Sequence, residues 1–314
     1  MAKILITGGA GFIGSNLAHA LVDDNDLTIV DNLSMGKKEN ISDIDIKFYE
    51  HDVCDSEFLH QLLSENDFDY IYYLAAVSSV ADSVARPLET HLVNQESVLD
   101  TLEYIRVKKL SIKRFLFTSS AAVYGNLSDF PKKETSHVQP LTPYAVDKYA
   151  AERFTIDYGK LYGLPTVAVR FFNVYGPRQN PESPYSGVLS IITKCMKNNK
   201  PFTLYGDGLQ TRDFVYVGDV VRALIKIATE TSESTVYNIA NGDETPLIDV
   251  IHTYESISGI KLDINKKESR NGDIKKSKAD ISRIKKIGFV PKWSLHEGLE
   301  NYWKYYLENN FGEE

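Results

Sequence analysis

Cysteine is nearly absent from this sequence, and histidine is sparse. Only Cys54 and Cys195 occur among 314 residues, and they lie far apart in the chain. They suggest neither a disulfide framework nor a zinc-binding spacing. The seven histidines include no His-Glu-x-x-His pattern. We therefore expect no bound metal, no structural disulfide and a reducing cytoplasm as the compartment.

An excess of positive charge and long hydrophobic runs are also missing. Lysine and arginine number 35 against 43 acidic residues, which gives a net charge of −8. This balance argues against a nucleic-acid partner, because phosphate binding normally needs a basic face. No apolar run is long enough to span a bilayer, and Gly8 and Gly9 interrupt the first run too early for a signal peptide. We expect a soluble protein with a small-molecule partner and no membrane contact.

The N-terminal stretch has the pattern of a dinucleotide-binding turn. A short apolar run at residues 4–6 predicts a strand covered on both faces, and Gly8, Gly11 and Gly14 lead from it into a helix. A second strand then ends in Asp31, where a ribose-binding acid belongs. A carboxylate can accept hydrogen bonds from ribose hydroxyls but would repel the extra phosphate of NADP. The cofactor predicted here is NAD.

The following residues alternate between strands and helices. Further strands are predicted near residues 46–49, 70–74, 115–117 and 166–169. This alternation predicts an α/β fold with a doubly wound parallel sheet, whose ligands lie beyond the carboxyl ends of the strands. Asp52 and Val53 could therefore flank the adenine. Residues 75–79 could line the nicotinamide side, although close helix packing would select the same small residues.

Tyr144 and Lys148 are one helical turn apart, so their side chains share a face. Holding a tyrosine ionised near neutral pH needs a pKa shift of roughly 3 units, or about 4 kcal/mol, which an adjacent ammonium and a positive nicotinamide ring could supply. Tyr144 could then act as a general base on an alcohol, with Ser120 binding the same oxygen. Read alone, a Tyr-x-x-x-Lys pair is more often a surface pair.

Three motifs together resemble the extended short-chain dehydrogenase/reductases across essentially the whole chain. They are Thr-Gly-x-x-Gly-x-x-Gly at residues 7–14, Ser119-Ser120 before Val-Tyr-Gly at residues 123–125, and Tyr144-x-x-x-Lys148. Within that family the sequence is most similar to the nucleotide-sugar 4-epimerases of the UDP-glucose and UDP-N-acetylglucosamine group. The features shared with this group are residues 31–34, Asn94, residues 170–173, 206–208, 212–214 and 238–242, and Arg270-x-Gly272-Asp273.

The resemblance implies a reaction at C4 of a UDP-hexose. Tyr144 would take the proton of a sugar hydroxyl while the hydride passes to NAD, and return of the hydride to the opposite face would complete the epimerisation. Dehydratases and glucuronate decarboxylases of this family typically carry an acid where this sequence has Ala122. Ser277 stands where relatives carry a residue that limits the pocket, and a small side chain there would admit a 2-acetamido group. It could equally pack at a loop.

The resemblance also assigns site residues. The expected cofactor contacts are Gly8, Gly11, Phe12, Ile13, Gly14, Asp31, Asn32, Ser34, Asp52, Val53, Leu74, Ala75, Ala76, Asn94, Tyr144, Lys148 and Phe171. The expected substrate contacts are Ser78, Ser79, Ser120, Asn173, Arg212, Arg270, Asp273 and Ser277, with the two arginines at the diphosphate.

Two interleaved domains and a homodimer are further expectations from the resemblance. The NAD-binding Rossmann domain would comprise residues 1–174 and 213–242, and a smaller α/β UDP-sugar domain residues 175–212 and 243–314. Helices near residues 93–110 and 144–162 correspond to those of a four-helix dimer interface in relatives. The partner is expected to be a UDP-hexose or UDP-N-acetylhexosamine.

Three alternatives stay open. UDP-glucuronate 4-epimerases usually carry threonine in place of Asn173, which lowers the case for a uronic acid without excluding it. Another nucleotide-sugar dehydratase or decarboxylase of the same family is the second alternative. The third is a non-catalytic NAD-binding regulator, against which the intact Ser120, Tyr144 and Lys148 argue.

Overall fold

The computed structural model of the chain describes residues 1–180, 187–269 and 275–309. These residues form two compact units, each made of three separate chain segments. The first unit comprises Met1–Leu127, His137–Phe171 and Val221–Tyr237, and the second comprises Ser128–Ser136, Phe172–Val220 and Asn238–Glu314. Each unit is therefore described by itself.

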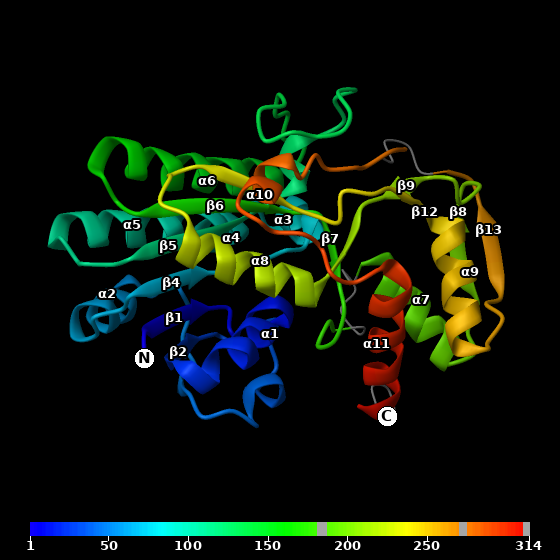
Figure 1. Cartoon of the computed structure of the whole chain (residues 1–314), viewed down its shortest axis with the longest axis horizontal. Coiled ribbons are helices and arrows are strands. Elements are labelled where there is room, and N and C mark those ends of the chain that lie inside the picture. Colours follow the sequence, from blue (N-terminus) through cyan, green and yellow to red (C-terminus); the bar gives the residue numbers. More distant parts are fainter. Residues whose placement is uncertain (181–186, 270–274, 310–314) are drawn as a thin grey trace. The chain divides into compact units, whose positions relative to one another are not determined.

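A seven-stranded parallel sheet forms the centre of the first unit (Figure 1). Its spatial order is β11-β6-β5-β4-β1-β2-β3, so the strand order reverses between β1 and β4. In such sheets a ligand binds outside the carboxyl ends of the strands at this reversal. The strands are β1 (Lys3–Thr7), β2 (Asp26–Val30), β3 (Lys47–Tyr49), β4 (Tyr70–Tyr73), β5 (Arg114–Ser120), β6 (Thr166–Phe171) and β11 (Val236–Ile239).

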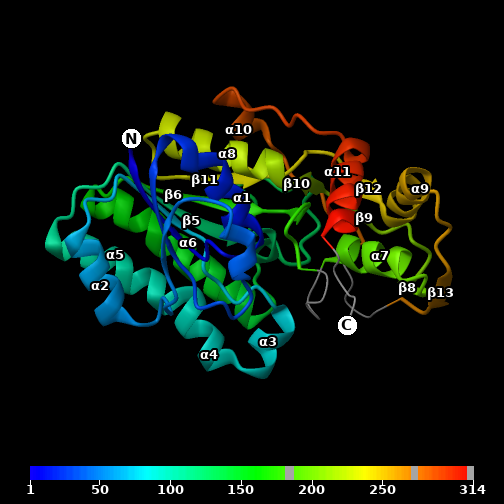
Figure 2. The ribbon, with the colours of Figure 1, turned by 90° about the horizontal axis from the view of Figure 1, so that it is seen from below.

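Helices cover both faces of this sheet. Figure 2 shows α2, α5 and α6 on one side, and α1 with α8 on the other. The helical elements are α1 (Phe12–Leu21), α2 (Ser56–Glu65), α3 (Val80–Ala85), α4 (Pro87–His91), the π-helical turn η3 (Leu92–Glu96), α5 (Ser97–Lys108), the 3₁₀ turn η4 (Ala121–Tyr124), α6 (Pro143–Tyr162) and α8 (Val217–Glu230).

Sequence signals mark both ends of α6, the longest helix among the described residues. The Thr142 hydroxyl accepts a hydrogen bond from the Ala145 N–H, and Pro143 occupies the first turn, where its missing N–H costs nothing. Gly163 ends the helix with φ of 74°, a left-handed conformation that suits glycine. These signals set where α6 starts and hence which side chains of its first turns reach the sheet.

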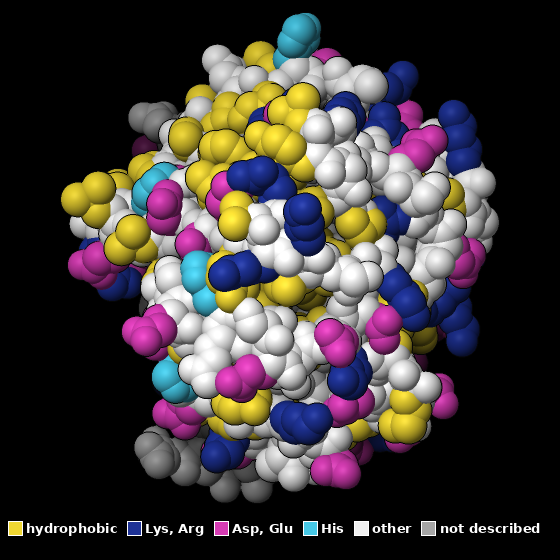
Figure 3. Space-filling view, turned by 90° about the vertical axis from the view of Figure 1, so that its left-hand side faces the viewer, with side chains coloured by type: hydrophobic (Ala, Val, Ile, Leu, Met, Phe, Trp, Pro, Cys, Tyr) yellow, Lys and Arg dark blue, Asp and Glu magenta, His cyan; other side chains and the backbone are white. Residues whose placement is uncertain are grey.

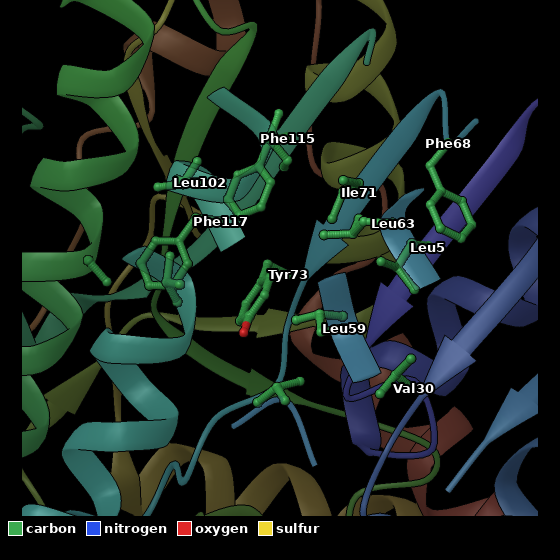
Figure 4. Packing of buried hydrophobic residues seen from close by; sticks show 14 of the residues in the cluster. Leu5, Val30, Leu59, Leu63, Phe68, Ile71, Tyr73, Leu102, Phe115 and Phe117 are labelled. Carbon is green, nitrogen blue, oxygen red and sulfur yellow. The ribbon is translucent and has the colours of Figure 1, made fainter. Parts of the chain in front are cut away.

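One hydrophobic cluster joins the sheet to α2, α5 and α6. Leu5, Ile71 and Phe117 of the sheet are fully buried there (Figure 4). Leu59 and Leu102 approach them from α2 and α5. Such close-packed apolar contacts hold the strand ends, and the loops that leave them, in fixed positions.

The described residues of the second unit form short strand pairs and helices. β7 (Asn173–Tyr175) pairs in parallel with β10 (Phe214–Tyr216), and β8 (Phe202–Tyr205) with β13 (Ile264–Lys267). β9 (Thr211–Arg212) and β12 (Thr245–Pro246) are antiparallel. The helices are α7 (Val188–Lys197), α9 (Leu247–Ser258), α10 (Ser282–Lys286) and α11 (Leu295–Glu308). A separate core lies among α7, α9 and α11 and includes Ile192, Tyr254 and Tyr302.

The predicted fold class is confirmed: the chain has an α/β fold with a doubly wound parallel sheet. The expected helix near residues 93–110 differs in detail, because its first part is the π-helical turn η3. The second unit also takes in residues 128–136, which the sequence reading kept within the nucleotide-binding portion. Across the described residues, no helix is both long and apolar enough to cross a bilayer.

Candidate active site

The glycine turn between β1 and α1 can be built only from small residues. Gly8 has φ of +70°, and a Cβ there would lie 2.8 Å from the Ala75 nitrogen. A Cβ on Gly14 would lie 2.2 Å from the Gly8 oxygen. Gly11 precedes α1 and has no side chain to cap its first turn, so the N–H groups there are open to an anion. This geometry fits the pyrophosphate of a dinucleotide.

Asp31 is tied directly to that turn. Its Oδ2 accepts the Ala10 N–H at 3.0 Å and its Oδ1 the Leu33 N–H at 2.8 Å, and Gly11 donates a further hydrogen bond. Burial raises the pKa of Asp31, against the lowering effect of these three donors. A carboxylate has about four acceptor positions, so one remains for a ribose hydroxyl. The residues present therefore fit NAD.

The loop after β2 brings three predicted cofactor residues together. Asn32 donates from Nδ2 to Asp52 Oδ2 at 2.7 Å and accepts the Ser34 N–H at 3.0 Å. Burial opposes ionisation of Asp52, but hydrogen bonds from Cys54 and Asn32 outweigh it and lower the pKa of this carboxyl. Asn40, which the sequence analysis missed, donates to the Ala10 oxygen at 2.9 Å and closes the loop onto the glycine turn.

The end of β4 is held by two side chains. The Thr7 hydroxyl accepts the Ala75 N–H at 3.2 Å. Asn94, in the π-helical turn η3, accepts the Val77 N–H at 2.9 Å and donates to the Val77 oxygen at 3.2 Å. Asn94 is fully buried, so its two hydrogen bonds hold the loop after β4 from the protein interior. Thr7 was part of the glycine motif, but the sequence analysis gave it no role of its own.

The other predicted residues of this unit lie near the same strand ends. Ser78 is exposed, whereas the buried Ser79 hydroxyl accepts the Asp82 N–H at 2.9 Å and caps α3. Val53 packs into the hydrophobic core. Leu74, Ala75 and Ala76 follow β4, Phe12 and Ile13 form the first turn of α1, and Phe171 ends β6.

Ser120, Tyr144 and Lys148 meet at the carboxyl end of β5. Tyr144 and Lys148 lie one turn apart on α6, and Ser120, the last residue of β5, forms a hydrogen bond with the Tyr144 hydroxyl. The Lys148 Nζ donates to the Thr118 oxygen at 2.9 Å and lies 4.9 Å from the centroid of the Phe117 ring. The structure thus brings together three residues from two separate elements.

Burial sets the electrostatics of this group. Burial raises the pKa of Tyr144, while the hydrogen bond with Ser120 lowers it. Burial lowers the pKa of Lys148 to about 7, and the charge of Asp147 acts in the opposite direction. A phenol and an ammonium poised in this way can exchange a proton with a hydroxyl placed beside them.

An ion pair one turn further along α6 supports the same face. Arg170 donates to Glu152 through Nε at 2.8 Å and through Nη2 at 2.6 Å, with both side chains buried. The guanidinium also lies 4.7 Å from the centroid of the Tyr124 ring in η4. It therefore links α6, β6 and the turn that follows Ser120. The sequence analysis did not identify Glu152, because a single glutamate on a helix gives no signal of its partner.

In the second unit, the segment that contains Ser277 runs beside β9, the strand that contains Arg212. Thr211 donates its N–H to the Lys275 oxygen at 2.9 Å, and the Ala279 N–H donates to Asp213 Oδ2 at 3.0 Å. The Arg212 Nη1 donates to the Thr211 oxygen at 2.9 Å. Asn173 donates from Nδ2 to the Asp213 oxygen at 3.0 Å. Arg270 and Asp273 lie outside the described residues.

Asp213 organises these segments. Its carboxylate is fully buried and accepts N–H groups of Asn241 at 2.9 Å, Gly242 at 3.1 Å and Ala279 at 3.0 Å. Burial raises the pKa of Asp213 to about 6, although these hydrogen bonds oppose the shift. The sequence analysis named Asp213 only as part of a motif and gave it no function.

Known proteins with the same architecture act on nucleotide sugars. Residues 4–240 match the NAD dependent epimerase/dehydratase family. The chain is 35% identical over 310 residues to a putative UDP-glucose 4-epimerase of Methanocaldococcus jannaschii, covering 98% of this chain and 99% of the relative. A UDP-N-acetylglucosamine 4-epimerase from Methanobrevibacter ruminantium, in complex with UDP-N-acetylmuramic acid, superposes with a TM-score of 0.92 at 37% identity, covering 98% of both chains. A UDP-glucose 4-epimerase of Thermotoga maritima with UDP-glucose gives the same TM-score and identity, covering 98% of this chain and 99% of that one.

Proposed function

Because the chain belongs to the NAD dependent epimerase/dehydratase family, we propose that it inverts C4 of a UDP-hexose through a transient 4-keto sugar. We further propose that it accepts UDP-GlcNAc and UDP-GalNAc as well as UDP-glucose and UDP-galactose. The observation that carries the proposal is the meeting of Ser120, Tyr144 and Lys148 at the end of β5. The reaction class follows from what these groups can do.

NAD is the cofactor of this family, and the first unit has the residues to hold it. Gly8, Gly11 and Gly14 leave space for the pyrophosphate, while Asp31 offers an acceptor to the adenine ribose. Bound NAD supplies reversible acceptance of a hydride. Asn32, Ser34 and Asp52 shape the adenine side, and the loop that Asn94 holds lines the other end.

Tyr144 handles the proton at O4 of the sugar. As the phenolate it takes this proton while C4 gives up its hydride, and as the phenol it returns the proton when hydride comes back to the other face of C4. Ser120 binds the same oxygen and keeps it within reach of Tyr144. The Lys148 ammonium favours the phenolate form, because an adjacent positive charge lowers the pKa of a phenol.

The turn after Ser120 favours epimerisation over elimination. Residues 121 and 122 are both alanine and begin η4. Neither side chain can donate or accept a proton at the neighbouring sugar carbons. A 4-keto sugar formed here therefore meets no second acid or base at this position. Elimination is not assisted, and return of the hydride is the favoured reaction.

The second unit supplies the candidates for binding the UDP-sugar. Arg212 and Arg270 offer guanidinium groups for the diphosphate, and Asn173 and Asp273 offer polar contacts. Ser277 is small, and the chain beside it is tied to β9 and to Asp213. A small residue there leaves room for a 2-acetamido group. The similar structure from Methanobrevibacter ruminantium, which holds UDP-N-acetylmuramic acid, supports this substrate class.

Proton NMR of the purified protein tests the proposal. The protein is incubated separately with UDP-GlcNAc, UDP-glucose and UDP-glucuronate, with no NAD added. Interconversion of the first two with their 4-epimers is the expected result. Turnover of UDP-glucuronate alone would favour a uronic acid epimerase, and a 4-keto or decarboxylated product would indicate a dehydratase or decarboxylase. No change in any sugar, even after NAD is added, would contradict the proposal.

We also propose that two copies associate through η3, α5 and α6 in a four-helix bundle. Large apolar side chains are exposed on or beside these elements: Val84, Leu88, Leu92, Val107, Val146, Phe154 and Leu161. Figure 3 shows hydrophobic side chains gathered on the surface that lies at the left of Figure 1, where α5 and α6 are drawn. Light scattering after size exclusion is expected to give twice the mass of one chain, and Phe154→Asp to shift it towards the monomer. Leu209→Asp, at an exposed leucine of the second unit, is the control.

A further inference from the structure

We propose that Asp147 is a positioning residue that keeps the Lys148 ammonium charged, and that His91 holds the Asp147 carboxylate for this purpose. The proposal rests on the proposed function, because it concerns how Tyr144 is prepared to take a proton. It extends the site to two residues that neither contact the reacting hydroxyl nor belong to the glycine turn.

The surroundings of Asp147 are unusual for a carboxylate. The residue is only 6% exposed. One oxygen, Oδ1, accepts a hydrogen bond from His91 Nδ1 at 2.8 Å. The other, Oδ2, is buried and makes no hydrogen bond within the part of the chain that the structure describes. A buried carboxylate normally has both oxygens satisfied, so a residue kept in this state points to a role for its charge.

Lys148 is the neighbour that needs such a charge. It is 2% exposed, and its Nζ meets the Thr118 carbonyl and the face of the Phe117 ring. Both stabilise a cation, but neither carries a negative charge. Asp147 is the carboxylate whose charge favours the protonated lysine. Glu152, one turn further along α6, is already neutralised by Arg170.

Other charged groups on the elements packed against α6 are paired with one another, are exposed, or lie at the far end of their own element. On α3 and α4, Arg86 bridges Asp82 and Glu89. In η3, Glu96 is exposed. On α5, Asp100 pairs with His60, and Glu103 with Arg106 and Tyr158. The charged residue of β5 is Arg114, at the opposite end of the strand from Ser120. Among these groups, His91 contacts Asp147 directly, and Lys148 is the buried cation on which the Asp147 charge acts.

A consequence for catalysis follows from this arrangement. A lysine buried without a negative neighbour loses its proton at lower pH, because burial disfavours the ammonium. Once Lys148 is neutral, it no longer stabilises the Tyr144 phenolate. The pH range in which Lys148 is charged while Tyr144 is ionised therefore narrows when Asp147 loses its charge.

Asp147→Asn tests this inference in the full-length protein with its NAD retained. The substitution keeps the shape and the acceptor for His91 but removes the charge. Asp157→Asn is the matched control, because Asp157 lies on the same helix in an exposed pair with Arg153 at 2.6 Å. Two quantities are measured: the dependence of kcat and KM on pH, and the ionisation of Tyr144 from absorbance at 295 nm, taken as the difference from the Tyr144→Phe form of each variant.

In Asp147→Asn, the alkaline limb of the kcat profile is expected to move to lower pH by about one unit, and the pKa of Tyr144 is expected to rise. KM is expected to change little, and Asp157→Asn to leave both profiles where they are. An equal loss of kcat at every pH, or unmoved profiles, would overturn the inference. The absorbance titration needs no substrate. A protein that epimerises no UDP-sugar would thus refute the proposed function while this inference is still tested.

Discussion

Asp31 in the first unit and Asp213 in the second each accept backbone N–H groups from other parts of the chain. Asp31 binds Ala10, 21 residues earlier, and Leu33, two residues later. Asp213 reaches 28 and 29 residues ahead, to Asn241 and Gly242, and 66 residues ahead to Ala279. The same chemical device thus closes a local motif in one unit and joins distant segments in the other.

This difference shows how each unit shapes the surface that is proposed to bind a ligand. In the first unit the shape comes from glycine residues whose neighbours leave no room for a Cβ. In the second it depends on one buried charge that gathers three loops. The first arrangement should therefore be sensitive to volume and the second to protonation, while the chemistry stays in the first. The predictions below test this division.

The largest effect is expected for Tyr144→Phe. Removal of the hydroxyl removes the group that exchanges the proton with O4, so kcat should fall by about 1,000-fold. KM and the amount of NAD retained should stay close to those of the parent protein, because the ring still fills its place. Steady-state kinetics and the cofactor content of the purified protein check this. A fall of less than about tenfold would show that another group is the base.

A pH-dependent stability contribution is expected from Asp213. Burial raises the pKa of Asp213 to about 6 in the folded protein, from an ordinary value of 3.8 that we take for the unfolded chain. Between these two pH values the folded protein therefore binds more protons than the unfolded chain. The free energy of unfolding should therefore decrease by about 2 kcal/mol as the pH rises from 4 to 6. Asp213→Asn should lack this component.

Urea unfolding of both proteins across this pH range provides the measurement. The difference between the two curves is the informative quantity, because other carboxyl groups titrate in both proteins. Parallel curves would mean that the backbone donors stabilise the ionised Asp213 as much as burial opposes it, so that its pKa does not change on folding. The second unit would then not be sensitive to the protonation of Asp213.

Gly14→Ala is expected to remove NAD binding. The new methyl group would overlap the Gly8 oxygen, so the turn must open. Activity without added NAD should fall by about 100-fold, and the purified protein should contain little cofactor. Gly163→Ala is the control: this glycine has φ of +74° but nothing within 4 Å of its Cβ position. It should lose about 1 kcal/mol of stability and retain its NAD.

The smallest effect is expected for Arg212→Ala in the second unit. Loss of a guanidinium from the diphosphate should raise KM about tenfold and leave kcat nearly unchanged. Kinetics with UDP-GlcNAc and UDP-glucose check this split. A loss confined to kcat would place Arg212 with the chemistry instead of with substrate binding.

Patterns that recur within a few tens of residues could be read from the sequence. The glycine turn, Asp31 and the Tyr144 and Lys148 pair all depend on local spacing, and the strand pattern predicted the parallel sheet, which the structure confirms. A strand order can be inferred from such patterns because crossover connections follow few rules. The edge strand β11 was not predicted as a strand, because its four residues follow a loop and carry little pattern.

Residues whose partners lie far along the chain could not be found in this way. Glu152 and Arg170 form a buried pair 18 residues apart, and His91 reaches Asp147 across 56 residues. Asn94 was named for the cofactor, but the structure shows both ends of its amide on Val77. Each of these contacts depends on how helices and strands pack together, and the residue spacing within one segment does not predict that packing.

The interleaving of the two units has a consequence for synthesis. The chain passes between them five times, since each unit has three alternating segments. The sheet lacks its edge strand until residues 236–239, which form β11, have been synthesised. The backbone of Lys132 likewise lacks its hydrogen bonds with Lys278 and Asp280 until those residues have been synthesised. A ribosome that stops early would thus release a chain in which β6 has an open edge, a known route to aggregation. Synthesis of either unit is therefore complete only after a substantial part of the other unit has also been synthesised.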